Sequence, residues 1–399
     1  MKNGYLSQYF DGIMAKRLSE VEANLAKSNQ HEFNGVAAMK RIFGTERQKF
    51  PTKFLFLDDE NPPISEDGFL TWYDAREKHP TRSEYRLFFP TTAVSRAASA
   101  GDILFIGFRP DKSALVVIAP GTSTIASQLA WLFNIEISDL FRVTSEFARN
   151  EVQLEYASKC ILEHIGIEVN DQNTDYLEDM LDRFDGRFPT TKEFSAYTRY
   201  TLHDVDARGN PDEVLVQWLE REEILFRTLE KHLIQQQLDK GFDDVDAFIA
   251  YSLSVQNRRK SRVGQSLENH FEMILKARNI RYDRTKVTEN RSKPDFIFPG
   301  IKEYHDERFE ASLLTMLGAK NTCKDRWRQV LAEADRIEQK HLLTLEAAIS
   351  VHQTDEMVSK NLQLVVPKSI HKTYTKQQQD WLMDVSSFIE LLAQKQAQI

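Results

Sequence analysis

The sequence predicts a mixed α/β chain with a small β-rich, barrel-like region first, a helical connector next and a larger α/β domain last. Three observations support this order. Short runs of strand-forming residues recur from Lys53 to Ala119, the pattern turns helical from Ser123 to about Thr201, and helix and strand patterns then alternate from Asp244 onward. A chain of 399 residues is also too long for one ordinary domain. We place the three regions at 1–150, 151–209 and 210–399.

The N-terminal region contains one expected helix and a set of short expected strands. The first ~30 residues have the pattern of an amphipathic helix. Runs rich in aromatic and branched residues follow, separated by turns that contain Pro, Gly or Asp. Their density predicts a small barrel or sandwich. The expected strands are Phe54–Leu57, Phe69–Tyr73, Tyr85–Phe89, Ile103–Ile106 and Leu115–Ile118.

Helix-start signals organise the middle of the chain. Thr190 and Glu193 have the spacing of a capping box, so a helix should begin there. The polar, glycine-bearing stretch 203–209 is our expected domain boundary. Asn210 as cap and Pro211 in the first turn then predict a long helix that continues to about Lys240.

The C-terminal region predicts a compact α/β core. We expect two separate helices, a β-meander, a helix of about four turns, two more strands and a terminal helix. The helices are expected at 244–255, 262–278 and 324–339, and the strands at 282–287, 295–298, 313–320, 342–345 and 362–366.

Composition describes a soluble globular protein, because hydrophobic residues make up 41% and charged residues 28% of the chain. The formal net charge of −8 argues against uniform coating of nucleic acid, although local basic clusters could still form a binding face. Two distant cysteines are no disulfide framework. The uncharged stretch 113–135 is interrupted by Pro120 and Gly121, so we expect no membrane span, and the N-terminus lacks the apolar core of a signal peptide. We therefore expect a cytoplasmic protein.

Two short motifs carry the chemistry. Asp295 follows Lys293-Pro294 at the start of an expected strand, and Lys320 ends the next apolar run 25 residues later. A carboxylate and a lysine at the ends of neighbouring strands are typical of metal-dependent phosphodiesterases, in which the acid binds a divalent cation and the lysine stabilises transition-state charge. Each residue alone also fits a plainer interpretation, a surface Asp at a turn and a lysine at a strand terminus.

From about Gly241 to Tyr374 the sequence resembles the catalytic domain of EcoRII-type restriction endonucleases, of the PD-(D/E)XK superfamily. The resemblance implies a restriction-endonuclease-like α/β core that hydrolyses duplex DNA with Mg²⁺ at a short CCWGG- or CCNGG-like site. Because such a site is two-fold symmetric, a homodimer is also expected. The matching stretches are 257–262, 266–268, 293–296, 304–306, 322–329, 333–335 and 364–367.

The resemblance assigns Asp295 as metal ligand and Lys320 as catalytic lysine. The usual pattern has an acid two residues before the lysine, where this chain has Gly318. A migrated carboxylate is implied instead, and Glu333 fits it if the helix from about Lys324 turns that side chain toward the strand end. A solvent-facing glutamate is the alternative.

Three further residues are catalytic candidates. Glu268 lies on the helix before the meander, where superfamily members place an additional acid near the metal. Tyr304 matches a tyrosine linked to the active site in the resembled family, although an interior tyrosine would look the same. His305 is a conceivable base, but an ordinary loop histidine is the preferred interpretation.

Basic residues indicate DNA contacts. Lys and Arg donate to guanine and Asp accepts from cytosine, so a run of these types after Lys320 suits reading of adjacent G·C pairs, a role that the resemblance also implies. A second basic run should contact phosphates. A solvated helix face is the alternative for both. The first run is Lys324, Asp325 and Arg326, and the second is Arg258, Arg259, Lys260 and Arg262.

Two expectations concern other regions. The resembled family extrudes a base and stacks it on an arginine and an aromatic residue, for which Trp218 and Arg221 are candidates, with core packing as the alternative for Trp218. The N-terminal region could bind a second DNA copy and restrain the nuclease, as the resemblance implies, or be an unrelated protein-interaction barrel.

Two other functions stay open. One is a modification-dependent or repair nuclease of the same fold. The other is a non-catalytic DNA-binding regulator, against which the joint presence of Asp295, Lys320 and Glu333 argues.

Overall fold

The computed structural model describes residues 5–23, 31–145, 156–167, 169, 176–323 and 326–399. The chain divides into two compact units, which we describe separately. Unit 1 comprises Met1–Asn170 and Ala347–Thr354, and unit 2 comprises Asp171–Glu346 and Asp355–Ile399. The three-region division made from the sequence remains a prediction.

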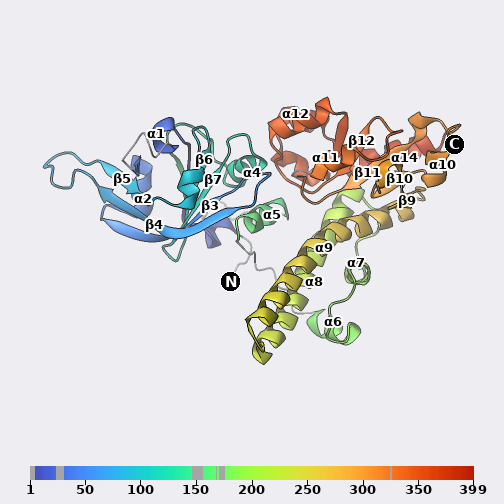
Figure 1. Ribbon diagram of the computed structural model, residues 1–399, viewed down its shortest axis with the longest axis horizontal. Helices are drawn as coiled ribbons and strands as arrows, with labels where there is room; N and C mark the ends of the chain where they lie inside the picture. Colours follow the sequence, from blue (N-terminus) through green and yellow to red (C-terminus); the bar gives the residue numbers. More distant parts are fainter. Residues whose placement is uncertain (1–4, 24–30, 146–155, 168, 170–175, 324–325) are drawn as a thin grey trace. The chain divides into compact units, whose positions relative to one another are not determined.

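Unit 1 is built on an eight-stranded sheet with the order β2-β5-β4-β3-β7-β6-β1-β8. Strands β3 to β7 of this sheet are labelled in Figure 1. Neighbouring strands are antiparallel except β3 and β7, which are parallel. The five expected strands are confirmed as β3 to β7. The strands are β1 (Gly12–Arg17), β2 (Glu32–Asn34), β3 (Gln48–Phe56), β4 (Ile64–Asp74), β5 (Tyr85–Phe88), β6 (Ile103–Phe108), β7 (Ala114–Ala119) and β8 (Arg142–Thr144).

The expected N-terminal helix is wrong over the described residues. β1 occupies residues 12–17 and pairs with both β6 and β8, and only α1 (Glu20–Ala23) is helical nearby, apart from a short 3-10 turn at Leu6–Gln8. Five consecutive β1 residues are buried. A strand buried on both faces lacks the period-2 alternation that distinguishes strand from helix, so periodicity misassigns it.

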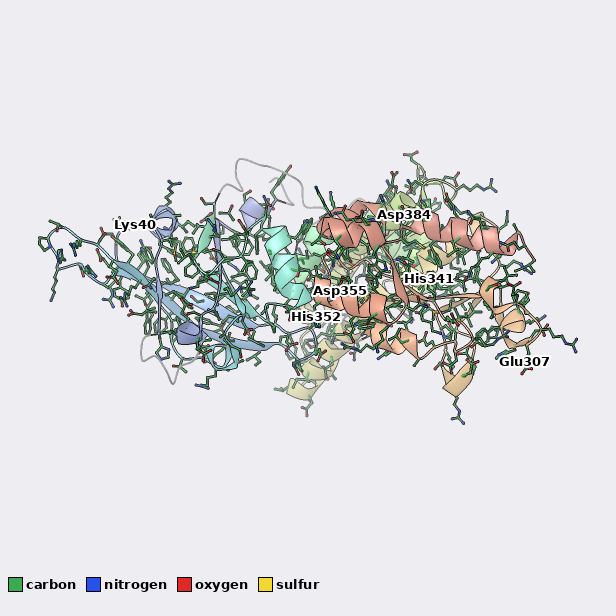
Figure 2. The ribbon with its side chains drawn as sticks, turned by 90° about the horizontal axis from the view of Figure 1, so that it is seen from above. Lys40, Glu307, His341, His352, Asp355 and Asp384 are labelled. Carbon is green, nitrogen blue, oxygen red and sulfur yellow. The ribbon has the colours of Figure 1, made fainter. Side chains whose placement is uncertain are left out.

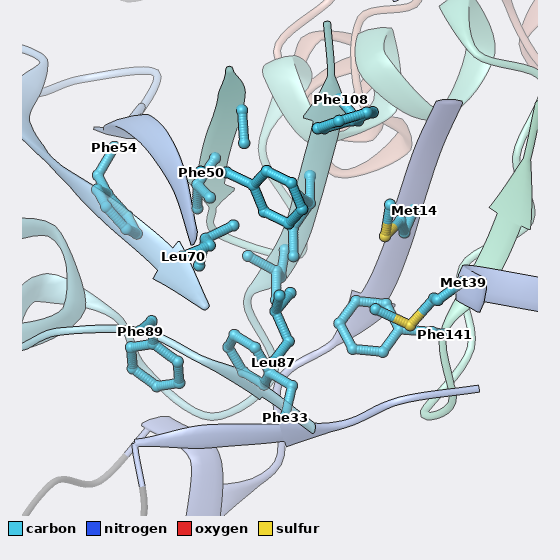
Figure 3. Packing of buried hydrophobic residues seen from close by; sticks show 14 of the residues in the cluster. Met14, Phe33, Met39, Phe50, Phe54, Leu70, Leu87, Phe89, Phe108 and Phe141 are labelled. Atoms are coloured by element: carbon cyan, nitrogen blue, oxygen red, sulfur yellow. The ribbon is translucent and has the colours of Figure 1, made fainter. Parts of the chain in front are cut away.

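An aromatic core fills unit 1 (Figure 3). Phe43 lies 5.1 Å from Phe50 and 5.4 Å from Phe108, measured between ring centroids. Phe33 on the edge strand β2 contacts Phe141, which precedes the opposite edge strand β8, with ring centroids 5.8 Å apart. The sheet is therefore curled around its core, in partial support of the barrel expectation.

Short helices cover this sheet. Within unit 1 the stretch Ala347–Thr354 is bound through α4, where Thr124 donates to Gln353 at 3.0 Å and Gln128 donates to the carbonyl of Ala347 at 3.0 Å. The remaining helices of this part are α2 (Lys40–Phe43), α3 (Ala93–Ala97), α4 (Thr124–Leu132) and α5 (Tyr156–His164), with a 3-10 turn at Ala37–Met39.

Unit 2 begins with α6 (Leu177–Arg183) and α7 (Thr191–Tyr200), followed by the long helices α8 (Pro211–Lys240) and α9 (Val245–Ala277), which lie side by side in Figure 1. The capping box of Thr190 and the Asn210 cap are both confirmed. The two helices expected between 244 and 278 are one helix, because the intervening basic run contains no Gly or Pro that would end it.

A mixed five-stranded sheet completes unit 2, with the order β13-β12-β11-β10-β9. β9, β10 and β11 are antiparallel, whereas β11, β12 and β13 are parallel. All five expected strands are confirmed; four are shorter than expected, and β12 begins and ends two residues earlier than expected. They are β9 (Asp283–Arg284), β10 (Phe296–Phe298), β11 (Thr315–Ala319), β12 (Lys340–Leu343) and β13 (Leu362–Val365).

Helices pack against this second sheet. His341 on β12, labelled in Figure 2, is 2% exposed, and its ring centroid lies 5.1 Å from that of Phe388 on α14. In the described part of the chain, no helix is both long and apolar enough to cross a membrane. The helices are α10 (Ile301–His305), α11 (Arg326–Leu331), α12 (Val351–Ser359), α13 (Lys376–Trp381) and α14 (Val385–Gln396), with 3-10 turns at Glu289–Arg291, Ala311–Leu313 and Lys368–Thr373.

Candidate active site

Asp295 and Lys320 meet at one end of the antiparallel pair β10–β11. Asp295 immediately precedes β10 and Lys320 immediately follows β11, so the pairing brings the two side chains together. Lys320 Nζ donates to Asp295 Oδ2 at 2.7 Å, and the backbone amide of Ala319 donates to the same oxygen at 2.7 Å. Both side chains are partly exposed, at 22% for Lys320 and 15% for Asp295. The pair is therefore held rigidly at a surface that a substrate can reach.

Glu268 on α9 faces this pair. Burial raises the pKa of Glu268, and the negative charge of Asp295 raises it further, whereas Arg284 and Lys320 oppose the shift. Arg284 Nη2 donates to Glu268 Oε2 at 2.7 Å. The charges of Asp295 and Lys320 therefore act on the Glu268 carboxylate.

Glu333 also faces Asp295, but from a turn and not from a helix. The helix expected to reach residue 339 ends at Leu331, so the helical argument for Glu333 is wrong. Burial and then the charge of Asp295 raise the pKa of Glu333 to about 7, while Lys320 and Lys340 oppose the shift. Glu333 therefore joins the acidic group around Asp295.

Local backbone contacts give this turn its shape. Ala334, the next residue, has a φ of 53°, in the left-handed region that tight turns use. Lys340 Nζ donates to the carbonyls of Ala334 at 2.6 Å and Ile337 at 2.5 Å. These bonds fix the turn that presents Glu333.

The position of Gly318 explains why the usual acid is absent there. A Cβ atom at Gly318 would lie 2.7 Å from Cγ2 of Val330 on α11, closer than any ordinary contact between carbon atoms. This strand position faces the helix and has no room for a carboxylate. A second acid must come from elsewhere, and Glu333 approaches Asp295 from the turn beyond that helix.

The donor chemistry suits a hard divalent cation. Three carboxylates share one end of the sheet, and two of them have raised pKa values because burial and a like charge disfavour ionisation. A divalent cation would relieve this repulsion, and carboxylate oxygens are the ligands that Mg²⁺ prefers. Among the described residues, however, no three His, Cys, Asp or Glu side chains are grouped closely enough to hold a metal as they stand.

Tyr304 has other partners. Its side chain is fully buried, and its hydroxyl donates to Glu289 Oε2 at 2.5 Å, while the amide of Arg336 donates to the hydroxyl at 3.4 Å. Burial and the hydrogen bond to Glu289 raise the pKa of Tyr304 strongly. His305 is exposed, with its ring 5.5 Å from that of Tyr304. These contacts describe a packed tyrosine beside the site, and a catalytic role for Tyr304 remains only a prediction.

The second basic run is mostly engaged within the protein. Arg262 is 5% exposed and pairs with Glu222 at 3.4 Å and with Glu223, which makes it a buried structural cation and corrects its assignment to phosphate. Arg259 pairs with Glu230 at 2.7 Å. The remaining two residues differ: Arg258 lies 3.8 Å from the ring centroid of Phe188, and Lys260 is exposed.

The other candidate DNA contacts are placed as follows. Arg326 is exposed at the first residue of α11, whereas Lys324 and Asp325 lie outside the described residues. Trp218 is 2% exposed and packs against His270, so it belongs to the core and cannot stack on a base. Arg221 lies 4.4 Å from the ring centroid of Tyr176.

Sequence reasoning missed Arg284 and its second partner, Glu272. Arg284 Nη1 donates to Glu272 Oε2 at 2.5 Å, in addition to its bond with Glu268. The four-residue spacing of the two glutamates on one helix was a usable signal. Their partner on a distant strand had no signal in the sequence.

Known proteins resemble the C-terminal part of this chain. Residues 226–389 match the family model described as EcoRII C terminal. The type II restriction enzyme EcoRII of Escherichia coli is 43% identical over 204 residues, which cover 51% of this chain and 50% of that enzyme. The chain therefore spans about half the length of this curated relative.

Two solved structures are also similar to part of this chain. Metal-depleted Ecl18kI in complex with uncleaved DNA is 18% identical with a TM-score of 0.45, over 55% of this chain and 83% of that one. The complex of restriction endonuclease PspGI with substrate DNA is 17% identical with a TM-score of 0.44, over 53% and 95%. The matched segment, residues 226–389, includes Asp295, Lys320 and Glu333, and over this segment the chain is similar to the C-terminal part of the EcoRII enzyme.

Proposed function

We propose that this protein is a type II restriction endonuclease that hydrolyses duplex DNA with Mg²⁺. The observation that carries the proposal is the Lys320–Asp295 pair at one end of β10–β11, faced by Glu333 and Glu268, within the segment that matches the family. A lysine beside clustered acids at a partly exposed strand end suits phosphodiester chemistry.

Each residue has a defined task in this proposal. Asp295 and Glu333 would hold the cation, which when bound polarises the phosphate and activates water. Lys320 would donate to the developing negative charge, and its backbone amide is fixed by a 2.9 Å bond to the carbonyl of Leu343. Glu268 would add negative charge that favours cation binding.

The proposed target is a short CCWGG- or CCNGG-like site. Arg326 is exposed six residues after Lys320 and is the described candidate for reading guanine, while Lys260 remains an exposed candidate for phosphate. A symmetric site requires two active sites, so we propose a homodimer. A cytoplasmic location and a second DNA copy at unit 1 complete the proposal.

The catalytic assignment is tested by Asp295→Ala and Lys320→Ala on a sequenced plasmid with Mg²⁺. Both variants should lose cleavage and keep most DNA binding, because their side chains act on the reacting phosphate. Lys302→Ala, at an exposed lysine of α10, is the control. Wild-type cleavage that persists in either variant would refute the assignment, and cleavage of methylated DNA alone would indicate a modification-dependent nuclease.

The readout assignment is tested by Arg326→Ala in competition binding with single-base variants of the mapped site. We expect a loss of about 1–3 kcal/mol of discrimination at one G·C pair. Arg328→Ala is the control on the same helix, because Arg328 already pairs with Glu356 at 3.0 Å. Full discrimination by the Arg326 variant would contradict the assignment.

A further inference from the structure

Arg284 joins two glutamates that lie one turn apart on α9. Its Nη2 donates to Glu268 Oε2 at 2.7 Å, and its Nη1 donates to Glu272 Oε2 at 2.5 Å. The three side chains are 24%, 18% and 17% exposed, so the pairs are only partly screened by solvent. The planar guanidinium presents its donors in a fixed fork, and each glutamate receives one side of it.

The two glutamates depend on Arg284 unequally. Glu272 also accepts from the Tyr282 hydroxyl at 2.8 Å and pairs with Lys276 at 2.9 Å. Glu268, by contrast, has Arg284 as its one recorded hydrogen-bonding side chain within the described residues. Loss of Arg284 would therefore leave Glu272 held in place but would release Glu268.

The sheet holds the guanidinium beside the candidate site. Arg284 on β9 pairs with Phe296 on β10, the residue that follows Asp295. Its guanidinium carbon lies 5.2 Å from the ring centroid of Phe296, which is fully buried. In addition, the backbone amide of Thr285 donates to the carbonyl of Asp295 at 3.3 Å. Arg284 therefore connects α9 to the strand that begins at Asp295.

We propose that Arg284 is a positioning residue that holds the Glu268 carboxylate toward Asp295 and Lys320, and so sets how tightly the site binds a divalent cation. Glu272 anchors the other side of the guanidinium and fixes its direction. The inference rests on the proposed function, because it concerns the same acidic group, but it makes a separate claim about a residue that contacts neither substrate nor metal.

The test measures Mn²⁺ binding to the full-length protein by calorimetry, together with the Mg²⁺ concentration at which cleavage is half-maximal. Arg284→Met should weaken both by about tenfold or more, the effect usual when a side chain that orients a ligand is lost. Arg284→Lys, which keeps one donor, should recover part of the loss. Glu272→Gln keeps a side-chain oxygen that can accept from Arg284, so the guanidinium stays anchored and both quantities should stay within about threefold of wild type.

The double variant Arg284→Met/Glu268→Gln decides whether Arg284 acts through Glu268. Its Mn²⁺ affinity should be no weaker than that of Glu268→Gln alone, because the two changes remove one interaction. The inference would be overturned if the losses of Mn²⁺ affinity in the two single variants added up in the double variant. It would also be overturned if Arg284→Met kept wild-type Mn²⁺ affinity. If Arg284→Met does not fold, Glu268→Gln and Arg284→Lys still decide it, since unchanged affinity in both would refute it.

The same experiments would give different results if the proposed nuclease function were wrong. In that case wild type would neither cleave duplex DNA nor bind Mn²⁺ more tightly than Asp295→Ala. A wild type that passes both tests, combined with Arg284→Met at wild-type Mn²⁺ affinity, would leave the nuclease assignment intact and refute only the role of Arg284.

Discussion

At the scale of single residues, Asp295 is the centre of the candidate site. Lys320 and the amide of Ala319 both donate to one of its oxygens, while Glu268 and Glu333 face it with like charge. Lys320 and Arg284 offset part of this charge, and an excess of negative charge remains at the strand end. That excess costs stability in the metal-free protein and favours a cation.

The cost should be visible in the pH dependence of stability. The pKa of Glu333 rises from about 4.5 to about 7 on folding, so the folded state retains a proton that the unfolded state releases. Protonated Glu333 therefore makes its full contribution to the free energy of unfolding below about pH 4.5. This contribution is lost as the pH rises through about 7. Glu333→Gln, without metal, should therefore be more stable than wild type above pH 7, by about 1–2 kcal/mol after solvent screening.

Urea unfolding at pH 5 and pH 8 measures this difference. Glu338→Gln, at an exposed glutamate five residues later, is the control and should show no such gain. Equal stability of Glu333→Gln and wild type at pH 8 would show that Glu333 is not confined near Asp295.

Arg262 provides a second prediction at this scale. Its guanidinium pairs with Glu222, which is fully buried and also bonds His270 at 2.9 Å. Arg262→Met would leave the buried Glu222 carboxylate without its cation, so it should lower the free energy of unfolding by about 3–5 kcal/mol. Lys260→Met, at an exposed position in the same run, should leave stability nearly unchanged and weaken DNA binding instead. If Arg262→Met has the same free energy of unfolding as wild type but binds DNA weakly, the prediction is wrong and Arg262 is a DNA contact.

At the scale of elements, the long helices are fixed at their ends. Asp212, in the first turn of α8, is 3% exposed and accepts from the backbone amides of Lys368, Val385 and Ser386, each at 2.9 Å. It therefore ties the start of α8 to the start of α14 and to the turn after β13. The acid is also favourable at this helix end because of the helix dipole.

Asp212→Ala should consequently destabilise unit 2 by roughly 3–5 kcal/mol, since several buried amides would lose their acceptor. Glu213→Ala, at the adjacent exposed position, should cost no more than about 1 kcal/mol. Denaturant unfolding of both variants decides the matter, and similar losses would show that Asp212 contributes only through the helix dipole.

At the scale of the whole molecule, the helices before residue 203 belong to the core of unit 2. Phe194 and Tyr197 of α7 are buried with Leu225, Phe226 and Leu229 of α8 in one hydrophobic cluster. Arg199 of α7 also bonds the His270 ring on α9 at 3.1 Å. A boundary at 203–209 would therefore cut through a core.

A fragment of residues 176–399 should fold cooperatively, whereas residues 203–399 should melt roughly 10 °C or more lower, or aggregate, because apolar faces of α8 and α9 lose their cover. Calorimetry of both fragments tests this. If the fragment 203–399 melts at the same temperature as the fragment 176–399, α6 and α7 are not needed for the stability of unit 2. Cleavage of single-site plasmids by the stable fragment and the full chain then tests whether unit 1 restrains the nuclease.

Local sequence patterns were enough to predict the strands with clear turn signals in both sheets, the α8 cap and the placement of Asp295 and Lys320 at neighbouring strand ends. These depend on local spacing, which sequence records directly. The other features depend on contacts between distant parts of the chain. β1 is a strand because its neighbours bury both of its faces. Glu333 lies near Asp295 because α11 ends at Leu331 and a turn with a left-handed residue at Ala334 follows. Arg262 and Trp218 are interior residues, and Arg284 lies on a strand that pairs with the residue after Asp295. Such contacts join residues far apart in the chain, and the pattern around any one of them does not contain its partner.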